Sequence, residues 1–464
     1  MAKSISVKRF GAEEKRLLAK VVDSGNFADH PGGFIRQFEG AFAKALGAKH
    51  AVSGATAMVL MHALPGAIGA GAGDEIICDP IVQFHGIAAL HGNVVPVWAD
   101  VRPDNFLMDP TDVQRKITKR TKAIWVTHLW GFPAEVDKLR RIADSHGIYL
   151  LEDCAHAMFL KYKGKYVGNW GHFGTFSFNM GKHLGAGEGG MAICNDDRLH
   201  EELRKRVIFG ESPPVLASNY RFNEFGAAVG LAQLRKVPGY LKEYLKGKTY
   251  LDAVVDDCAW LQERVPPPGG GVSPYTWACI FRGDRKGHSA RALINATNAL
   301  GVRFGLGFTQ RPAYLYDFFR VPRAYGDKGC PLHCSFYHGK RPNWKPGLCP
   351  VAEDVLPQLV TTSNMVRASE CKRKAEVLRR AIQMVELGKA PPDEYSEEQK
   401  LILDIAQALQ PIGPTDVQKQ LKRKGVMLTV ERVHELMERL RSSFPRKLSY
   451  AGPEKFAYHD LSRT

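Results

Sequence analysis

One lysine stands between an aromatic triplet and a run of glycines in the segment FSFNMGKHLGAGEGG, residues 176–190. Glycines beside a lysine suggest a phosphate loop, in which backbone N–H groups and an ammonium surround a nucleotide's phosphates. The spacing excludes this motif, because Gly174 lies too far from Gly181 and His183 follows where serine or threonine is required. Lys182 is therefore a candidate amine nucleophile.

A lysine that forms a Schiff base indicates pyridoxal 5'-phosphate as the cofactor, and this cofactor needs four further groups from the protein. These are a carboxylate for the pyridine nitrogen, a phosphate cup, an aromatic ring against one face, and a polar partner for the phenolic oxygen. Asp153 ends an apolar strand in YLLEDCAHA, where pairing with a protonated pyridine nitrogen would offset the cost of a buried carboxylate. Helix capping is the alternative role for Asp153.

The other three groups also have candidates. The segment SGATA, residues 53–57, precedes the apolar helix MVLMHAL, so N–H groups and the helix dipole would favour a phosphate there, although ordinary capping is the alternative. Phe84 could stack on the cofactor or belong to the core. His156, three residues after Asp153, could reach the phenolic oxygen or be structural.

These candidates lie in a region, residues 50–200, where short apolar strands alternate with amphipathic helices. The predicted strands are DEIICDP, VVPVWAD, KAIWVTH, IYLLEDC, GTFSF and GGMAICN. This pattern is typical of an α/β domain with a largely parallel sheet. Ligands bind beyond the carboxyl ends of such strands, and Phe84, Asp153 and Lys182 are at or just past strand ends.

The rest of the chain predicts further units. Long helices are expected over residues 225–237 and 241–259, and YTWACIF begins a second, smaller α/β unit. The expected organisation is a large cofactor-binding domain over 1–250, a small α/β subdomain over 251–388, a linker over 389–395 and a terminal domain over 396–464. The sequence of the terminal domain predicts helices over 396–410, after 415 and over 429–441, followed by a hairpin in KLSYAGPEKFAYHDL. Three helices followed by a hairpin is the order of a winged helix.

The motifs and their order resemble the DegT/DnrJ/StrS family of sugar aminotransferases, which are fold type I pyridoxal phosphate enzymes. The family's FEeaFA..lGakhav..SGTaAL is similar to FEGAFAKALGAKHAVSGATAM here. The further matches are GDEIICDP, TKAIWVTHLWG, LEDCAHA, FSFNMGKHLGAGEGG, NYRFNEFGAAVGLAQL and CPVAE. The resemblance runs from about residue 36 to 384 and implies transfer of an amino group, from glutamate or another amino acid, to a keto-sugar, a nucleotide-linked sugar or a cyclitol.

The resemblance also implies a role for each candidate. Lys182 would hold the cofactor and move the proton, Asp153 would pair with the pyridine nitrogen, and His156 would lie beside the phenolic oxygen, where the family usually has glutamine. The other cofactor contacts would be the ring of Phe84 and the phosphate ligands Ala55, Thr56, Ser177 and, from the neighbouring subunit, Asn219. A homodimer with shared active sites is therefore expected.

Departures from the family pattern leave the substrate open. Ala55 stands where the family has threonine, which removes one hydroxyl from the phosphate cup. PIVQFHG replaces PsfTf.A and puts Gln83 and His85 beside Phe84. The loop FGLGFTQRPAYLYDFF differs from the loop with which the family meets its sugar.

Composition and charge bound the functional classes. The chain has 464 residues, of which 44% are apolar and 24% charged, as in soluble globular proteins. The start has no apolar leader and no apolar stretch reaches about 18 residues, so we expect a cytoplasmic protein without membrane contact. The net charge of +16 implies an anionic partner.

Two alternatives remain open at this point. The basic charge and the tail are compatible with a decarboxylase or related pyridoxal enzyme that acts on a modified DNA base, with nucleic acid as a partner. However, the tail's Lys and Arg nearly balance its Asp and Glu, so the excess charge belongs to the catalytic body. The second alternative is a non-catalytic regulator built on the same fold.

A cysteine- and histidine-rich loop is a weaker candidate for a metal site. It contains Cys330, His333, Cys334, His338 and Cys349. The C-x-x-H-C spacing lacks the paired C-x-x-C motifs of structural zinc sites. We therefore expect a packed loop and predict no metal.

Overall fold

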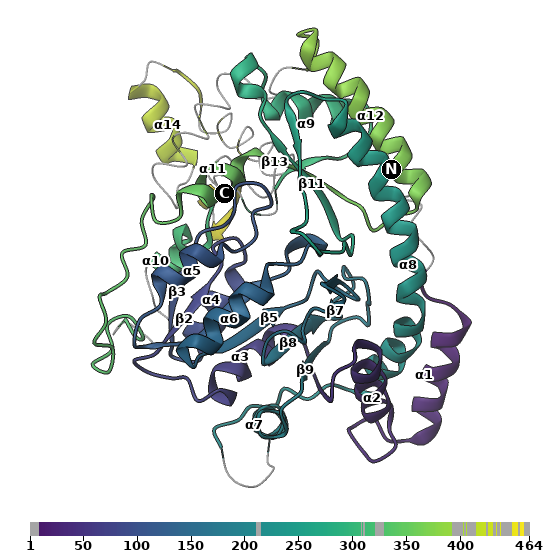
Figure 1. Cartoon of the computed structure of the whole chain (residues 1–464). Helices are drawn as coiled ribbons and strands as arrows, with labels where there is room; N and C mark the ends of the chain where they lie inside the picture. Colours follow the sequence, from purple (N-terminus) through teal and green to yellow (C-terminus); the bar gives the residue numbers. More distant parts are fainter. Residues whose placement is uncertain are drawn as a thin grey trace.

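The computed structural model describes most of the chain (Figure 1). The described residues are 9–209, 215–307, 309, 311–320 and 329–391, followed by 402, 405, 414–423, 426–429, 433, 437, 448–452 and 455–458.

A seven-stranded sheet forms the centre of the larger part of the molecule. Its strands, in spatial order, are β1 (His50–Gly54), β9 (Gly190–Cys194), β8 (Phe173–Ser177), β5 (Tyr149–Asp153), β4 (Thr121–Thr127), β2 (Glu75–Cys78) and β3 (Val95–Trp98). The five strands from β8 to β3 are parallel, whereas β9 runs antiparallel to both of its neighbours. The largely parallel sheet and all six predicted strands are confirmed, and β1 is an additional edge strand.

Helices cover both faces of this sheet, because nearly every residue of its strands is buried. They are α2 (Phe34–Leu46), α3 (Ala57–Ala67), α4 (Gln83–His91), α5 (Pro110–Lys116), the short η1 (Leu129–Gly131), α6 (Val136–His146) and α7 (Asp197–Val207). A two-stranded ribbon, β6 (Lys161–Tyr162) and β7 (Lys165–Tyr166), follows β5. Helix α3 packs on α4 and α7, and α5 packs on α6.

A long helix, α8 (Glu224–Asp256), joins the two parts of the molecule. Its first half packs on α1 (Ala12–Ser24) and α2, and its second half packs on α12 (Ala368–Glu386) (Figure 1). The prediction of two helices here was wrong, because Pro238 lies inside the continuous helix. Packing on both halves offsets the backbone hydrogen bond that a proline removes.

The second part of the molecule has an antiparallel sheet and its own apolar core. The strand order is β10 (Leu261–Glu263), β11 (Thr276–Phe281), β13 (Leu359–Ser363) and β12 (Gly305–Leu306). Helices α9 (Ala290–Ala299) and α12 cover it around Leu293, Trp277 and Leu378. The remaining short helices are η2 (Gly283–Lys286), η3 (Ala313–Leu315), α10 (Asp317–Arg320), α11 (Pro350–Val355) and η5 (Leu356–Gln358).

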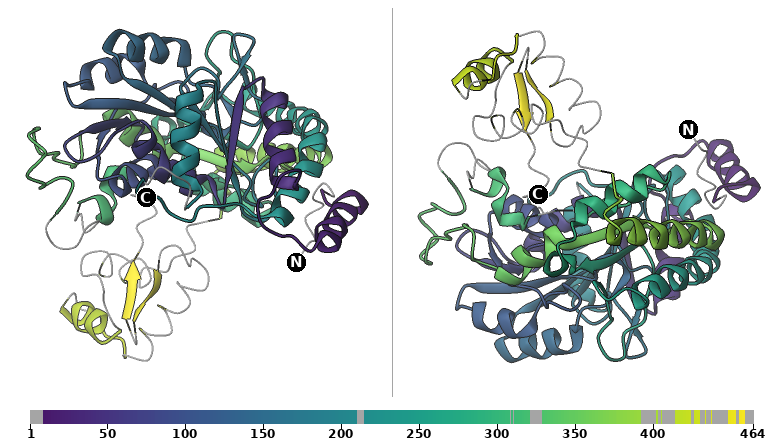
Figure 2. Two further views of the ribbon diagram at one scale, coloured as in Figure 1. Left: turned by 90° about the horizontal axis from the view of Figure 1, so that it is seen from below. Right: turned by 90° about the horizontal axis from the view of Figure 1, so that it is seen from above.

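The C-terminal segment contains one described helix and one hairpin. Helix α14 (Pro414–Arg423) confirms the helix predicted after residue 415, and β14 (Leu448–Gly452) pairs antiparallel with β15 (Lys455–Tyr458), as predicted. Figure 2 shows α14 and the hairpin to one side of the two sheets. The helices predicted over 396–410 and 429–441 lie mostly outside the described residues, so the winged helix remains a prediction.

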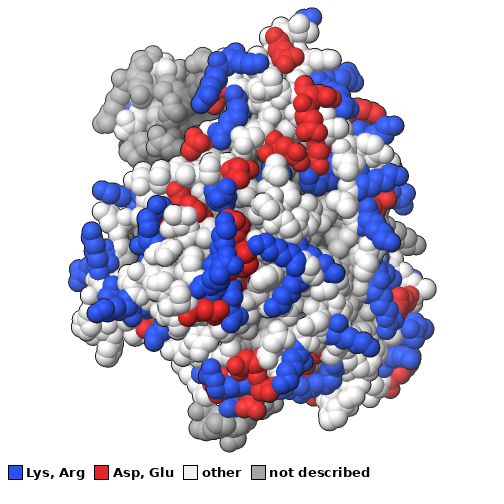
Figure 3. Space-filling model, in the orientation of Figure 1, with Lys and Arg blue, Asp and Glu red and all other residues white. Residues whose placement is uncertain are grey.

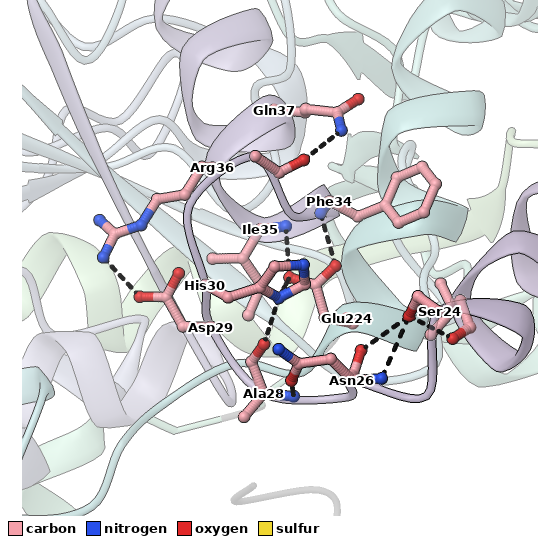
Figure 4. A network of polar contacts seen from close by, with 12 residues as sticks. Ser24, Asn26, Ala28, Asp29, His30, Phe34, Ile35, Arg36, Gln37 and Glu224 are labelled. Carbon is pink, nitrogen blue, oxygen red and sulfur yellow. Dashed lines mark hydrogen bonds and ion pairs between the residues drawn. The ribbon is translucent and has the colours of Figure 1, made fainter.

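A buried glutamate connects the N-terminal segment to α8. The carboxylate of Glu224, at the start of α8, accepts the backbone N–H groups of Phe34 and Ile35 and so caps α2 (Figure 4). Asp29, in the loop before α2, forms an ion pair with Arg36 at 2.6 Å. Glu224 belongs to the motif NYRFNEF, so one role of this motif is to hold the N-terminal segment against α8.

The cysteine- and histidine-rich loop over residues 330–349 was considered from the sequence as a metal site. Among the residues that the structure describes, the group of metal-ligand side chains that gathers within 4.8 Å is His128, Glu152 and Cys154. The five cysteine and histidine residues of 330–349 therefore form no such cluster. Glu152 instead accepts hydrogen bonds from His128 and from two backbone N–H groups, which gives it a structural role.

The visible surface carries both signs of charge. Figure 3 shows Lys and Arg side chains spread over this face with Asp and Glu among them. None of the helices that the structure describes is long and apolar enough to cross a membrane.

Candidate active site

The lysine lies on a closed loop between β8 and β9. Backbone hydrogen bonds from Phe178 to Gly189 (2.8 Å) and from Met180 to Gly187 (3.0 Å) close the loop. Gly187 and Gly189 adopt positive φ angles of 94° and 151°, which other residues rarely adopt. These glycines therefore allow the backbone to adopt the turns that close the loop containing Lys182.

The Lys182 amine lies in a partly desolvated position beside an aromatic residue. Its Nζ donates to the hydroxyl of Tyr275 at 3.3 Å and lies 4.8 Å from the centre of that ring. Burial lowers the pKa of Lys182 to about 8, and the negative charge of Asp153 opposes this shift only in part. A substantial fraction of the amine is therefore neutral near physiological pH.

An arginine from the N-terminal segment holds the lysine loop in place. The guanidinium of Arg9 donates to the backbone carbonyls of Met180 (3.2 Å), Lys182 (2.7 Å) and His183 (2.7 Å). Two side chains of α8 in turn hold the carbonyl of Arg9, since Gln233 donates to it at 2.7 Å and Tyr240 at 3.0 Å. The loop is thus connected to the long helix through one residue.

Asp153 lies at the carboxyl end of β5 and is almost completely buried. Its Oδ1 accepts the N–H of Ala155 at 2.9 Å, and its Oδ2 lies 3.1 Å from Nε2 of His85. Burial raises the pKa of Asp153, but the hydrogen bond from His85, the electrostatic effect of the neighbouring imidazoles and the Ala155 N–H outweigh it, so the pKa is lowered overall. Asp153 is therefore an ionised carboxylate.

His156 is buried and neutral. Burial, followed by the charge of Lys182, lowers the pKa of His156 well below its ordinary value. Its ring stacks on Tyr275 with centroids 4.3 Å apart, and its Nδ1 has no hydrogen-bond partner among the described residues. Because buried polar atoms are normally paired, this nitrogen is available to a ligand.

Three backbone segments form a cradle at the start of α3. Gly190 pairs with Gly54 on one side and with Ser177 on the other, so β1, β9 and β8 bring these residues side by side. A Cβ at Gly190 would lie 2.4 Å from the backbone nitrogen of Ala57, which shows how closely the helix start approaches the sheet. The first N–H groups of α3 and the Ser177 hydroxyl are thus close to one another.

The predicted phosphate ligands differ in what they offer. The hydroxyl of Thr56 accepts the N–H of Val59 at 3.1 Å and caps α3. The N–H of Ala55 already donates to the carbonyl of Tyr220 at 2.8 Å. This N–H group is therefore not free to bind a phosphate. Asn219, one residue before Tyr220, is exposed and accepts a hydrogen bond from Arg221 at 2.9 Å.

The structure brings Lys182, Asp153 and His156 into electrostatic contact, and Phe84 is 37% exposed on α4 next to the fully buried His85. Sequence reasoning missed the contacts of His85, Tyr275 and Arg9. A signal existed for His85, which departs from the family pattern beside Phe84. Tyr275 and Arg9 carried no such signal.

Comparisons with known proteins identify the family of the chain. The chain matches the DegT/DnrJ/EryC1/StrS aminotransferase family over residues 8–339. It is 36% identical over 236 residues to a GDP-perosamine synthase of Vibrio cholerae, covering 49% of this chain but only 64% of that protein. It is 35% identical over 321 residues to an L-glutamine:2-deoxy-scyllo-inosose aminotransferase of Streptomyces kanamyceticus, covering 64% of this chain and 74% of that protein.

The fold has close counterparts among solved structures. The structure of 3-amino-5-hydroxybenzoic acid synthase superimposes with a TM-score of 0.71 at 24% identity, covering 82% of this chain and 99% of that chain. The fold class predicted from the sequence, that of fold type I transferases, is thereby confirmed. By its sequence match over most of the chain, the protein belongs to the DegT/DnrJ/EryC1/StrS aminotransferase family, whose cofactor is pyridoxal 5'-phosphate.

Proposed function

We propose that this protein is a pyridoxal phosphate-dependent aminotransferase that moves an amino group from glutamate or glutamine to a keto-sugar, a nucleotide-linked sugar or a cyclitol. The observation that carries the proposal is the Lys182 amine, with a pKa lowered to about 8, beside the ionised Asp153 and the neutral His156. Family membership and the named relatives support the same chemistry.

The residues present fit the cofactor. The Nδ1 of His156, which has no hydrogen-bond partner among the described residues, suits the phenolic oxygen. The cradle at Gly190, with the Ser177 hydroxyl and the start of α3, suits the phosphate, with Thr56 ordering the helix start. The exposed ring of Phe84 suits stacking on the cofactor ring.

Each side chain then has a defined task. Pyridoxal phosphate, when bound, supplies an aldehyde that carries the amino group and a ring that withdraws electrons. Lys182 would hold the cofactor through its Nζ, which is neutral in part near physiological pH, and would move the substrate proton through the same atom. Asp153 would keep the pyridine nitrogen protonated through its carboxylate, and His156 would offer a ring nitrogen to the phenolic oxygen.

We also propose a homodimer in which each site is completed by the other subunit. Asn219 is exposed beside the Ala55–Tyr220 contact, where it can reach a phosphate held by a second copy. Two exposed phenylalanines, Phe27 and Phe225, pack near the start of α8 with tilted rings whose centroids are 4.9 Å apart, and they provide apolar surface for that partner. The predicted domain limits and cytoplasmic location remain predictions.

The alternatives considered from the sequence are not favoured. The named relatives are enzymes of sugar and cyclitol amination, which supports neither chemistry on a DNA base nor a purely regulatory role. Lys and Arg are mixed with acidic residues on the face shown in Figure 3. This face therefore shows no continuous basic surface that would support DNA binding.

The substrate class is tested by two probes. Pyridoxal phosphate-loaded protein is mixed with GDP-perosamine, and conversion of the cofactor to its amine form is followed by absorbance. In parallel, 2-deoxy-scyllo-inosose and L-glutamine are supplied and the aminated cyclitol is measured by mass spectrometry. Turnover with one probe supports the proposal and identifies the class, whereas a response to neither contradicts the substrate assignment.

A further inference from the structure

Two adjacent residues at the start of α4 have opposite environments. Phe84 is 37% exposed, whereas His85 is completely buried. Successive helical residues point about 100° apart, so one faces the cofactor region and the other faces the sheet. His85 therefore lies beneath the proposed cofactor site and cannot contact a substrate.

His85 lies between two buried carboxylates at the carboxyl ends of β5 and β2, the two strands that flank β4. Its Nε2 lies 3.1 Å from Oδ2 of Asp153, the last residue of β5, and its Nδ1 lies 3.4 Å from Oδ2 of Asp79, which follows β2. Because an ionised carboxylate only accepts hydrogen bonds, Nε2 carries the proton of the bond to Asp153. Trp125 on β4 stacks on the imidazole with centroids 5.4 Å apart and fixes its plane.

Asp79 is itself held by three donors. The hydroxyl of Thr127 donates to its Oδ2 at 2.5 Å, and the N–H groups of Ile81 and Val82 donate to its Oδ1 at 3.1 and 3.0 Å. Thr127 Oγ1 also lies 3.3 Å from His85 Nε2. The groups that face His85 from the packed strands are thus Asp79, Thr127 and Asp153. Asp153 and Thr127 lie within hydrogen-bond distance of Nε2, whereas Nδ1 has no hydrogen-bond partner among the described residues and faces Asp79 at an ion-pair distance.

The arrangement leaves Asp153 with one side-chain partner in the described structure. Its Oδ1 accepts a backbone N–H, and its Oδ2 accepts from His85. Without this imidazole, two buried carboxylates would face one another across the strand ends, and proton uptake by one of them would relieve the repulsion. A protonated Asp153 could no longer hold a charged pyridine nitrogen.

We propose that His85 is a positioning residue that keeps Asp153 ionised and aimed at the pyridine nitrogen of the cofactor, with Asp79 and Thr127 fixing the imidazole. The inference rests on the proposed function, because it concerns the cofactor named there. It assigns a task to a residue at which this chain departs from the family pattern.

Two substitutions of similar size separate this task from a general packing role. In His85→Gln the side-chain amide nitrogen can occupy the place of Nε2 and donate to Asp153. In His85→Asn the amide reaches only the place of Nδ1, on the side of Asp79. Affinity is measured by equilibrium titration of the apo-protein with pyridoxal phosphate and with its 1-deaza analogue, which has carbon in place of the pyridine nitrogen.

We expect H85N to bind pyridoxal phosphate about tenfold or more weakly than the unmodified protein, because one hydrogen bond to a charged group is lost. H85Q should retain most of the affinity, and all three proteins should bind the deaza analogue alike. An equal loss of affinity for both ligands, or no loss in H85N, would overturn the proposal. Failure of the unmodified protein to bind either ligand would instead refute the proposed function.

A second measurement does not depend on the folding of H85N. The ¹⁵N spectrum of histidine-labelled apo-protein, with the His85 signal assigned by its loss in H85Q, reports which ring nitrogen carries a proton. A protonated Nε2 is expected. A neutral ring protonated only at Nδ1 would contradict the proposed contact with Asp153.

Discussion

The Lys182 amine is subject to two opposing effects. Burial disfavours its charged form, and the nearby carboxylate of Asp153 favours it, with burial the stronger of the two. The result is a pKa of about 8, which places the change of charge close to neutral pH. A nucleophile that must be neutral to attack an aldehyde is thereby active where an ordinary lysine would be almost entirely protonated.

This shift predicts how cofactor capture depends on pH. The observed rate at which apo-protein takes up pyridoxal phosphate should rise with pH, reach half of its maximum near pH 8 and level off about one to two pH units higher, where nearly all of the Lys182 amine is neutral. Stopped-flow absorbance at pH values from about 6 to 10 measures this rate. A rate that continues to rise toward 10.5, the ordinary pKa of lysine, would contradict the assigned environment.

The site could be predicted from the sequence where its residues belong to continuous motifs. Lys182, Asp153 and His156 stand in two short segments whose strand ends were recognisable. The partners of these residues were not predictable, because each contact joins distant parts of the chain. His85 and Asp153 are 68 residues apart, Lys182 and Tyr275 are 93 apart, and Arg9 and Lys182 are 173 apart.

At the scale of elements, the loop between β8 and β9 depends on Arg9. We predict that Arg9→Ala weakens pyridoxal phosphate binding by about tenfold, because charge-assisted hydrogen bonds to three loop carbonyls are lost. Arg9→Lys should be intermediate, since an ammonium cannot reproduce the guanidinium's spread of donors. Titration and hydrogen exchange of residues 180–186 measure the effect, and unchanged exchange in R9A would refute the role of Arg9.

The contact of β9 with α3 gives a second prediction for an element. Gly190→Ala should lower the free energy of unfolding by about 1–3 kcal/mol, because its Cβ would lie 2.4 Å from the Ala57 nitrogen. Gly40→Ala, in α2 with no atom within 4 Å of the added carbon, is the matched control and should stabilise by up to about 1 kcal/mol. Denaturant unfolding measures both, and a neutral G190A would show that the cradle is not tightly packed.

The elements themselves followed largely from local patterns. Apolar runs such as AIWV in β4 predicted strands buried on both faces, and the sheet confirmed them. The continuity of α8 was not predictable, because Pro238 is a strong local stop signal that only tertiary packing overrides. The edge strand β1 was missed because its five residues, HAVSG, contain few β-branched side chains.

At the scale of the whole molecule, the proposed shared sites predict complementation between two inactive variants. Lys182→Ala lacks the nucleophile, and Asn219→Asp places a negative charge where the partner's phosphate would bind. In an equal mixture, hybrid dimers contain one intact site, so about a quarter of the wild-type activity should return if subunits exchange freely. The mixture is refolded together and assayed for aminotransfer.

The matched control is each variant refolded alone. Return of activity only in the mixture is the expected result. A mixture as inactive as its components, although sedimentation shows a dimer, would place Asn219 at its own subunit's site and contradict shared sites.

The central claim is that the Lys182 amine binds pyridoxal phosphate covalently and that the amine of the amino donor replaces it. The most direct test is borohydride reduction of the cofactor-loaded protein, followed by peptide mass spectrometry, with and without prior addition of L-glutamate or L-glutamine. The account predicts a cofactor adduct on Lys182 that disappears when the amino donor is added first. An adduct on another lysine, no adduct, or an adduct on Lys182 that neither donor removes would contradict it.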